Sequence, residues 1–265
     1  MENTNNAVSE IAALAAQGLK LQVVNGIPFA YVREDYGLSN LEHLLPAPTR
    51  KRGDTKVQDQ AGFLAVFKRH QTADSTVIYA DRHAAVFRAV FNDDTAEQAG
   101  WKDHTTTYAC PKSNEWQVWT KNDGVKMSQE QFARFIEQNL VDIYEPAAAN
   151  MLEISRELVA KKSANFSSSI RLSNGSHQFH YDEDIKGSTK SGNLEVPETF
   201  VIGLPVFLNG DAYKIEARLR YRIKEQQLEM WYELVRPHDV YEDAFNAVHK
   251  AIAEATGREI VNAEI

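Results

Sequence analysis

The stretch from Val201 to Val235 constrains the fold more than any other part of the chain, because apolar and charged residues alternate along most of it. Phe200 to Leu208 is a continuous apolar run that ends at the turn pair Asn209-Gly210. Alternation follows, pauses at Glu225-Gln226 and then resumes. A period of two residues is typical of strands with one buried face, and Asn-Gly between two such runs favours a hairpin. The stretch therefore predicts a three-stranded antiparallel meander with one apolar and one charged face.

Three arginines lie on the charged face of this predicted meander. With Glu225 and Gln226 as the turn, the register places Arg222 opposite Glu229, Arg220 opposite Trp231 and Arg218 opposite Glu233. Cross-strand pairs contribute roughly 0.2–1 kcal/mol each, so one interpretation is a solvated sheet face held by ion pairs. The alternative is a site for nucleotide or single-stranded nucleic acid, in which guanidinium groups bind phosphate and an indole ring stacks on bases. Its residues are Arg218, Arg220, Arg222 and Trp231, and the sequence leaves both interpretations open.

The composition limits where such a site can lie. Hydrophobic residues make up 43% of the chain and charged residues 25%, as in an ordinary soluble globular protein. The 29 basic and 37 acidic residues give a net charge of −8, so a nucleic-acid site must be a local patch on an acidic body. An acidic body is also compatible with mimicry of nucleic acid towards a protein partner.

The single cysteine and the apolar runs indicate the compartment. Cys110 alone excludes intrachain disulfides and a multi-cysteine zinc site, which fits a reducing environment. The first residues are polar and acidic, and no apolar run approaches the length of a membrane span. We therefore expect a cytoplasmic protein without a membrane partner.

The remaining patterns predict helices and further strands. One helix is expected from Gln60, and the capping box that starts at Ser128 begins another that extends to Ile143. Further helices are expected over Ala147–Lys162 and from the N-cap Asp239 to Thr256. Strands are expected at Ser75–Ala80, Ala84–Asn92 and Thr105–Cys110, with a hairpin around the two-residue turn Asn174-Gly175 that pairs Ile170 with Phe179, and an exposed loop over Glu183–Glu198.

These elements predict an α+β fold in which helices cover a mainly antiparallel sheet built of hairpins and the meander. The chain divides into an N-terminal α+β lobe, residues 1–126, and a part with the helical segment, the meander and the C-terminal helix, residues 127–265; one continuous domain is the alternative. Exposed strand edges favour a homo-oligomer.

Candidate chemistry is limited to one weak pattern. His180, Asp182 and Asp184 alternate, so they share a face if a strand extends that far, and imidazole and carboxylate groups bind divalent ions. The structural alternative is a strand that ends in an acidic loop. The sequence pairs Cys110 with no particular histidine, Ser167-Ser168-Ser169 has no nucleophile-elbow context, and GxxxxGK[ST], GxGxxG and HExxH motifs are absent. We therefore predict no catalytic residue and no cofactor, with a metal-dependent hydrolase as one functional alternative.

Three stretches together resemble a known family. They are Gly100-Trp101 with Tyr108 and Trp116-x-x-Trp119; Met127-Ser128-Gln129-x-x-Phe132-Ala133-x-Phe135-Ile136-Glu137; and Pro205-Val206-Phe207 leading into Tyr213 and Arg218-x-Arg220-Tyr221-Arg222. The chain resembles the YfdQ-like proteins of tailed phages and prophages over most of its length. That family is functionally uncharacterised, so the resemblance implies no catalytic residues. It implies a context, the early or accessory region of phage genomes.

This context favours a protein that acts by binding. We expect a non-enzymatic phage or prophage accessory protein that binds a host protein or complex, such as a defence component, in the cytoplasm of the bacterial host. The alternative from another class is a nucleotide or single-stranded nucleic-acid module that uses the arginines and the tryptophan of the meander.

Overall fold

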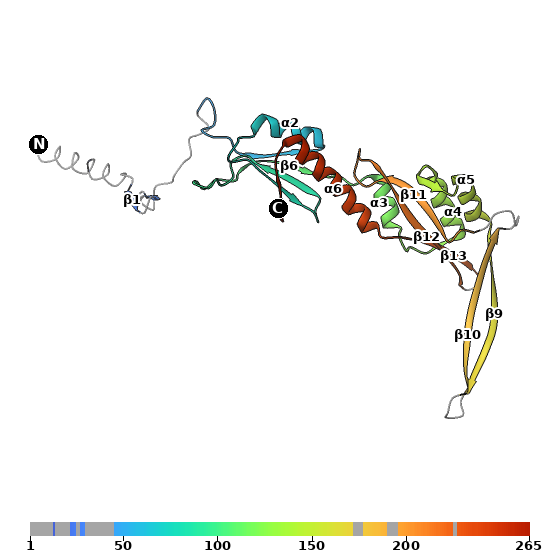
Figure 1. Ribbon diagram of the computed structural model, residues 1–265. Helices are drawn as coiled ribbons and strands as arrows, with labels where there is room; N and C mark the ends of the chain where they lie inside the picture. The colour runs from blue at the N-terminus through green and yellow to red at the C-terminus, as the bar shows by residue number, and fades with distance from the viewer. Residues whose placement is uncertain are drawn as a thin grey trace, which may run out of the picture. The chain divides into compact units, whose positions relative to one another are not determined.

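The computed structural model describes residue 13, residues 22–24 and 27–29, and residues 45–171, 177–189, 196–224 and 227–265; of residues 22–24, 27–29, 159–171 and 177–189 it describes the backbone. The chain forms two compact units, Met1–Lys51 and Arg52–Ile265. In the first unit, β1 (Gln22–Val24) and β2 (Ile27–Phe29) form an antiparallel hairpin. The elements below belong to the second unit (Figure 1). The division after residue 126 stays a prediction.

The first five-stranded sheet of the second unit is mixed. Its strands are β3 (Gly53–Val57), β4 (Val77–Asp81), β5 (Val86–Val90), β6 (His104–Ala109) and β14 (Ile260–Asn262), in the order β14-β4-β5-β6-β3. Strands β4, β5 and β6 pair in antiparallel, whereas β14 and β3 join the two edges in parallel. The predicted α+β fold with mostly antiparallel strands is confirmed, with the correction that this sheet contains parallel edges.

The second five-stranded sheet contains the predicted meander. Strands β11 (Thr199–Pro205), β12 (Ala212–Lys224) and β13 (Gln227–Leu234) pair in antiparallel, with β7 (Met127–Ser128) and β8 (Ile143–Glu145) at the edges, in the order β7-β13-β12-β11-β8. Strand β11 ends before the apolar run does. The Ser113 hydroxyl donates a hydrogen bond to the Pro205 carbonyl oxygen, and the Ser113 backbone N–H donates one to the Val206 carbonyl oxygen. These bonds take the place of further pairing between β11 and β12.

Helices pack against both sheets. They are α2 (Gln60–His70), α3 (Asn114–Lys121), α4 (Gln129–Gln138), α5 (Ala148–Glu157) and α6 (Pro237–Thr256), with the 3-10 turn η2 (Leu140–Asp142) after α4. The predicted capping box is present, since Ser128 and Gln131 exchange hydrogen bonds between side chain and backbone. None of the helices in the described part of the chain is both long and apolar enough to span a membrane.

Trp119 of α3 lies at the centre of the core behind the second sheet. Its side chain is fully buried, and its ring centroid lies 5.0 Å from those of Phe135 on α4 and Tyr232 on β13. The indole Nε1 donates to Asp142 Oδ2 over 2.8 Å, and the Tyr232 hydroxyl donates to the Trp119 carbonyl oxygen. Trp116, on the same side of α3, is buried as well. One side chain thereby connects α3, α4, η2 and β13.

Helix α6 joins the cores of the two sheets. Phe245 stacks on Phe87 of β5 with ring centroids 5.1 Å apart, and one helical turn earlier Tyr241 contacts Phe207, next to the end of β11, at 5.4 Å. Figure 1 shows α6 extending from the first sheet to the second. Residues on both sides of position 126 thus share one hydrophobic cluster.

The predicted N-cap of α6 is wrong. The helix begins at Pro237, and its N-cap is Arg236 in the left-handed region at φ 50°. Proline is favoured in the first helical turn because its fixed φ suits a helix and it has no N–H to leave unsatisfied. Asp239 instead lies in the first turn and pairs with Arg236 over 2.7 Å. The helix ends at Gly257, which has a φ of 63°.

Two helices end earlier than the sequence predicts. Asn139 caps α4, and Ile143 pairs with Ile202 of β11 instead of continuing the helix. Helix α5 ends at Glu157, although its pattern predicts a helix as far as Lys162. Gln129 Nε2 donates to the carbonyl oxygens of Arg156 and Leu158 at 3.1 and 3.0 Å, so it provides the last turn with partners that further helix would have supplied.

Strands β9 (Leu158–Arg171) and β10 (His177–Thr189) form a two-stranded antiparallel ribbon, separate from both five-stranded sheets. A hairpin is confirmed here, but the strands are longer than predicted, and β10 replaces the start of the loop expected from Glu183. The predicted register is also wrong, because Ile170 pairs with Gln178 and not with Phe179. Five residues, 172–176, separate the paired ends of the strands, where the prediction allowed two.

The core behind the second sheet yields a stability prediction. Phe132 of α4 is fully buried, so Phe132→Ala is expected to lower the free energy of unfolding by about 3–5 kcal/mol through lost burial and a cavity. The matched control is Val141→Ala, because Val141 is 93% exposed and its truncation should change the value by less than about 0.5 kcal/mol. Urea titrations of the three proteins measure both effects, and equal midpoints would contradict this account of the core.

Candidate functional sites

The charged side of the meander faces away from the helices. Its positions alternate with buried Ile215, Ala217 and Leu219 on β12 and with buried Met230 and Tyr232 on β13. We call this surface the arginine face. Its members are Lys214, Glu216, Arg218, Arg220, Arg222 and Lys224 on β12, and Gln227, Glu229, Trp231 and Glu233 on β13.

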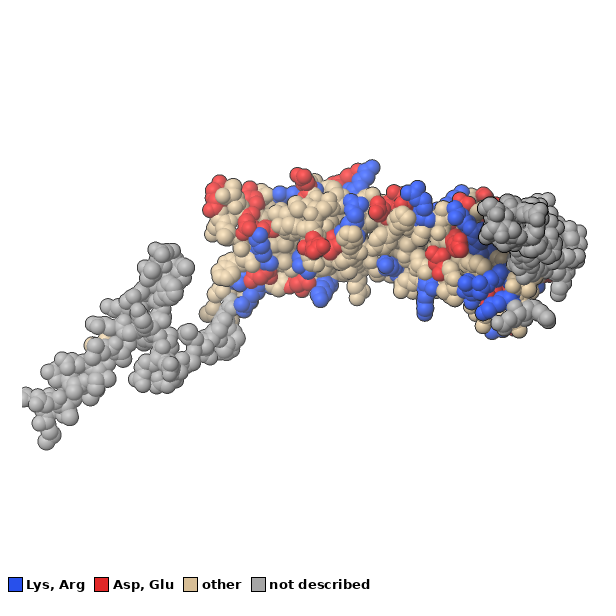
Figure 2. All heavy atoms as spheres, turned by 90° about the horizontal axis from the view of Figure 1, so that it is seen from below, with Lys and Arg blue, Asp and Glu red and all other residues tan. Residues whose placement is uncertain are grey.

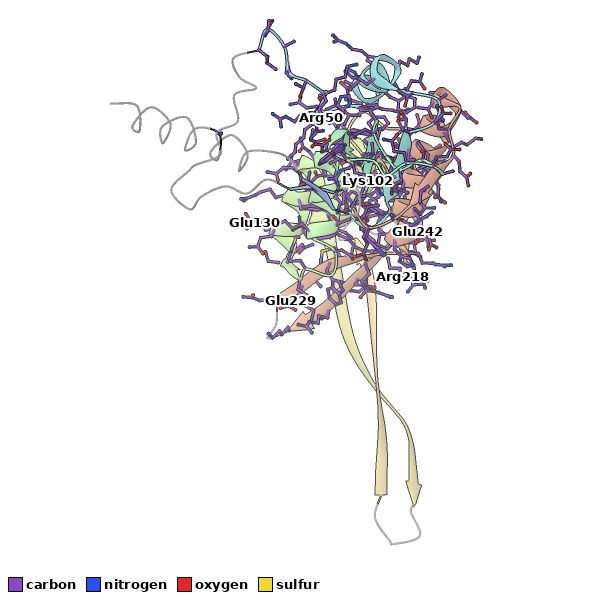
Figure 3. All side chains as sticks on the ribbon, turned by 90° about the vertical axis from the view of Figure 1, so that its left-hand side faces the viewer. Arg50, Lys102, Glu130, Arg218, Glu229 and Glu242 are labelled. Atoms are coloured by element: carbon purple, nitrogen blue, oxygen red, sulfur yellow. The ribbon has the colours of Figure 1, made fainter. Side chains whose placement is uncertain are left out.

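The register predicted for this face is confirmed. Arg222 lies opposite Glu229, Arg220 opposite Trp231 and Arg218 opposite Glu233. Arg222 Nε donates to Glu229 Oε2 over 2.6 Å, as its register position predicts. The other arginines deviate from a directly opposed pairing, because Arg220 Nε donates diagonally to Glu233 Oε2 over 3.1 Å. Figure 3 shows Arg218 and Glu229 among the side chains of these two strands.

Arg218 is thereby displaced from the carboxylate opposite it. Glu233 already accepts hydrogen bonds from Arg220 and from Trp231 Nε1, the latter over 3.2 Å. These two donors and the nearby arginine charges lower the pKa of Glu233. Among the described residues, the Arg218 side chain makes no hydrogen bond, and it acts on the Glu233 carboxylate through charge alone.

Two cationic side chains lie over the ring of Trp231. Lys126 Nζ lies 5.6 Å from the ring centroid and the Arg222 guanidinium carbon lies 5.9 Å from it. The predicted role of Trp231, a stacking surface for bases, therefore competes with two cation contacts within the protein. The structure places Lys126 on this face, which the sequence pattern does not reveal, because the β7–β13 pairing beside it joins residues about a hundred positions apart.

A second aromatic residue extends the basic surface towards β8. Lys214 Nζ lies 3.7 Å from the centroid of the Tyr144 ring, and Tyr144 is about half exposed. Lys214 belongs to the same alternation as the three arginines, so the sequence predicts its position on this face. The sequence did not predict the position of Tyr144, because its segment was expected to be helical.

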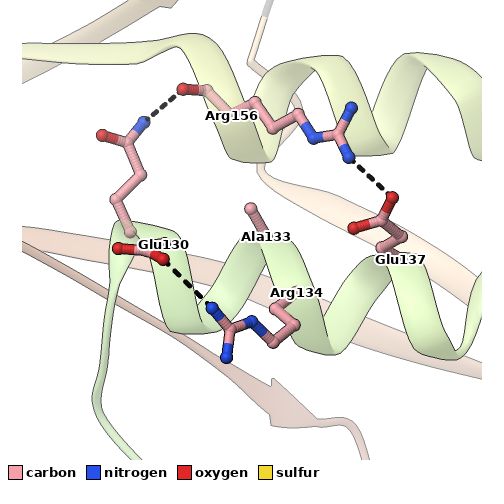
Figure 4. Close-up of a pocket in the computed structure, with 6 residues that line it drawn as sticks. Glu130, Ala133, Arg134, Glu137 and Arg156 are labelled. Atoms are coloured by element: carbon pink, nitrogen blue, oxygen red, sulfur yellow. Dashed lines mark hydrogen bonds and ion pairs between the residues drawn. The ribbon is translucent and has the colours of Figure 1, made fainter.

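A polar surface hollow between α4 and α5 is lined by charged side chains that pair with one another. It has a volume of about 370 Å³ and is lined by Gln129, Glu130, Ala133, Arg134, Glu137 and Arg156. Arg134 pairs with Glu130 over 3.1 Å and Arg156 with Glu137 over 2.7 Å (Figure 4). Each charged side chain of the hollow already has a partner within the protein. We therefore interpret the hollow as part of the packing between α4 and α5 and not as a ligand site.

The predicted metal ligands lie on the ribbon. His180, Asp182 and Asp184 occupy alternate positions of β10, opposite Ser168, Asn165 and Ser163. Their side chains are outside the described part, so the metal site stays a prediction. Among the described side chains, no group of three histidine, cysteine, aspartate or glutamate residues could hold a metal ion.

The ribbon register sorts its residues onto two faces. One face holds the positions of Phe166, Phe179 and Tyr181, which are all its aromatic residues, together with Ile185. It begins at Leu158, whose side chain is buried in the core. The opposite face holds the positions of the three predicted metal ligands and their polar partners. The first face also holds the positions of Lys162, Arg171 and Glu183, so the ribbon gathers its aromatic residues on one face among charged ones.

Comparison with known proteins yields one match. The model of a family described as "Uncharacterized conserved protein (DUF2303)" matches residues 1–264. No curated protein and no solved structure matches the chain.

The ion pair between Arg222 and Glu229 should have a measurable but small coupling energy. A double-mutant cycle with Arg222→Ala and Glu229→Ala, followed by urea unfolding, is expected to give about 0.2–1 kcal/mol, since both side chains are partly exposed. A parallel cycle with Arg218→Ala and Glu229→Ala should give a value near zero, because Arg218 makes no contact with that carboxylate. Equal coupling energies in the two cycles would show that the Arg222–Glu229 ion pair does not stabilise the protein.

Cys110 should react slowly in the folded protein. Its side chain is 7% exposed, and burial raises the pKa of the thiol to about 12. Because the thiolate is the reactive form, modification by an aromatic disulfide reagent at pH 8 is expected to be at least about a hundredfold slower than in denaturant. Equal rates in the two states would contradict the burial of Cys110.

Proposed function

This chain belongs to the DUF2303 family, and we propose that it acts by binding another protein through the ribbon of β9 and β10. The observation that carries the proposal is the isolation of this ribbon. Its two strands pair with each other and with no further strand in the described part of the chain. A hairpin of two strands is marginally stable in water by itself, so a ribbon of this length implies a surface that covers it.

The distribution of residue types on the ribbon indicates how a partner is bound. The aromatic residues and Ile185 occupy positions on one face, which they share with Lys162, Arg171 and Glu183, and polar residues occupy most positions on the other face. A partner with an apolar surface would bury the aromatic residues, and polar groups at its rim would pair with the charged residues of the same face. Open strand edges add backbone groups that a partner strand can pair with.

The context of the partner comes from the resemblance to the YfdQ-like proteins of phages and prophages. We propose a bacterial host protein as the partner, with defence components as the first class to test. The net charge of −8 adds little to this proposal, because Lys and Arg are interspersed with Asp and Glu on the face in Figure 2.

Native mass spectrometry of protein purified from bacterial cells at low salt tests the proposal. We expect the wild-type chain to retain a second polypeptide, and Phe179→Ser/Tyr181→Ser to retain at least about tenfold less of it, because these positions supply two of the three aromatic residues of the ribbon. The matched control is Gln178→Ser/Asn165→Ser on the opposite face, which should retain the polypeptide.

The masses also distinguish the partner. A mass that is a multiple of the chain identifies a second copy and would replace the host-protein assignment with self-association. A wild-type chain found only as a monomer, or equal retention by all three proteins, would overturn the role of the ribbon.

A further inference from the structure

The arginine face has an excess of positive charge on an acidic protein. Its β12 and β13 positions carry five basic and three acidic side chains, and Lys126 adds a sixth cation over Trp231. The chain as a whole has a net charge of −8, so this face opposes the charge of the body that carries it. A local basic surface of this kind concentrates anions near it.

The two ion pairs on the face leave donors unused. Arg220 and Arg222 each bond a carboxylate through Nε alone. A guanidinium group has five N–H donors in a planar fork, so each terminal pair of nitrogens retains donors for a second anion. Arg218 contributes its whole fork, because Glu233 is occupied by Arg220 and Trp231.

The carboxylates of β13 position the cations without neutralising the row. Glu229 holds the Nε side of Arg222, whose guanidinium also lies over Trp231. Trp231 in turn is fixed by the bond from its Nε1 to Glu233. The arginine side chains are thereby partly ordered before a ligand binds, which lowers the entropic cost of binding.

The cations form a single row along β12. Arg218, Arg220, Arg222 and Lys224 occupy alternate positions, so successive cations repeat about every 6.8 Å along the strand. One row of repeating cations fits one chain of repeating anions. Glu229 and Glu233 border the row on the β13 side, where they would repel a second phosphate chain.

We propose that the arginine face binds the phosphate backbone of single-stranded nucleic acid. Phosphates contact the terminal nitrogens of the three arginines and the Lys224 ammonium group. Trp231 serves as a support for Lys126 and Arg222, so affinity comes mainly from backbone contacts and depends little on base sequence. The residues of this site belong to β12 and β13, whereas the proposed protein-binding surface belongs to β9 and β10.

Fluorescence anisotropy with a labelled 30-nucleotide oligothymidylate tests the proposal. With four phosphate contacts, wild-type affinity should fall about 50-fold between 50 and 200 mM NaCl, because each contact adds about 0.7 to the logarithmic salt slope of a single strand. Arg218→Ala should lower that slope by about 0.7, and Arg218→Ala/Arg220→Ala/Arg222→Ala should lower it by about 2. Arg218→Glu should weaken binding at 50 mM further than Arg218→Ala does.

The matched control is Lys250→Ala, which removes an exposed cation of α6 that lies 3.9 Å from Glu254. It should keep the wild-type slope, and unchanged melting temperatures confirm that each variant is folded. No oligothymidylate binding at 50 mM NaCl, or equal slopes for Lys250→Ala and the triple variant, would overturn the site. Equal or tighter binding of a 30-base-pair duplex would overturn the single-strand assignment.

Discussion

The hydrogen bond between Trp119 and Asp142 joins α3 to the turn that leads into the edge strand β8 of the second sheet. Asp142 is 7% exposed, and burial raises the pKa of its carboxyl group, so the indole N–H is a partner that the folded state requires. Asp142 belongs to the 3-10 turn between α4 and β8. Holding this turn against α3 ends the helix and directs Ile143 into its pairing with β11. The packing of η2 against α3 and the start of the edge strand β8 therefore meet at one buried contact.

Local signals account for the parts of the fold that were predicted correctly. The two-residue period and the turn at Glu225-Gln226 defined the register of β12 and β13, because both features act between neighbouring strands. The capping box at Ser128 likewise depends on residues three positions apart. For the candidate site, the same period placed Arg218, Arg220 and Arg222 on one face. The diagonal bond from Arg220 to Glu233 was not predictable, because side-chain geometry and the competition for one carboxylate decide it.

Contacts between distant residues account for what the sequence did not reveal. The parallel edges β14 and β3, the short strand β7 and the position of Lys126 depend on where the chain returns after long excursions. The helix ends at Asn139 and Glu157 had the same cause, since apolar residues beyond them fit a helix equally well by period. Ile143 and Leu158 are both buried, but in strands. Periodicity identified residues with a buried side, and tertiary pairing chose the backbone conformation that buries it.

The return of β14 to β4 has a consequence for synthesis of the chain. The paired residues Ile78 and Ile260 are 182 positions apart (260 − 78), and Ile78 is fully buried in the finished sheet. At roughly 5–20 residues per second, a ribosome needs about 10–40 s to add the intervening residues. During that time the outer edge of β4 has unpaired backbone groups next to apolar side chains. The nascent chain therefore exposes this edge of β4 until β14 has been synthesised.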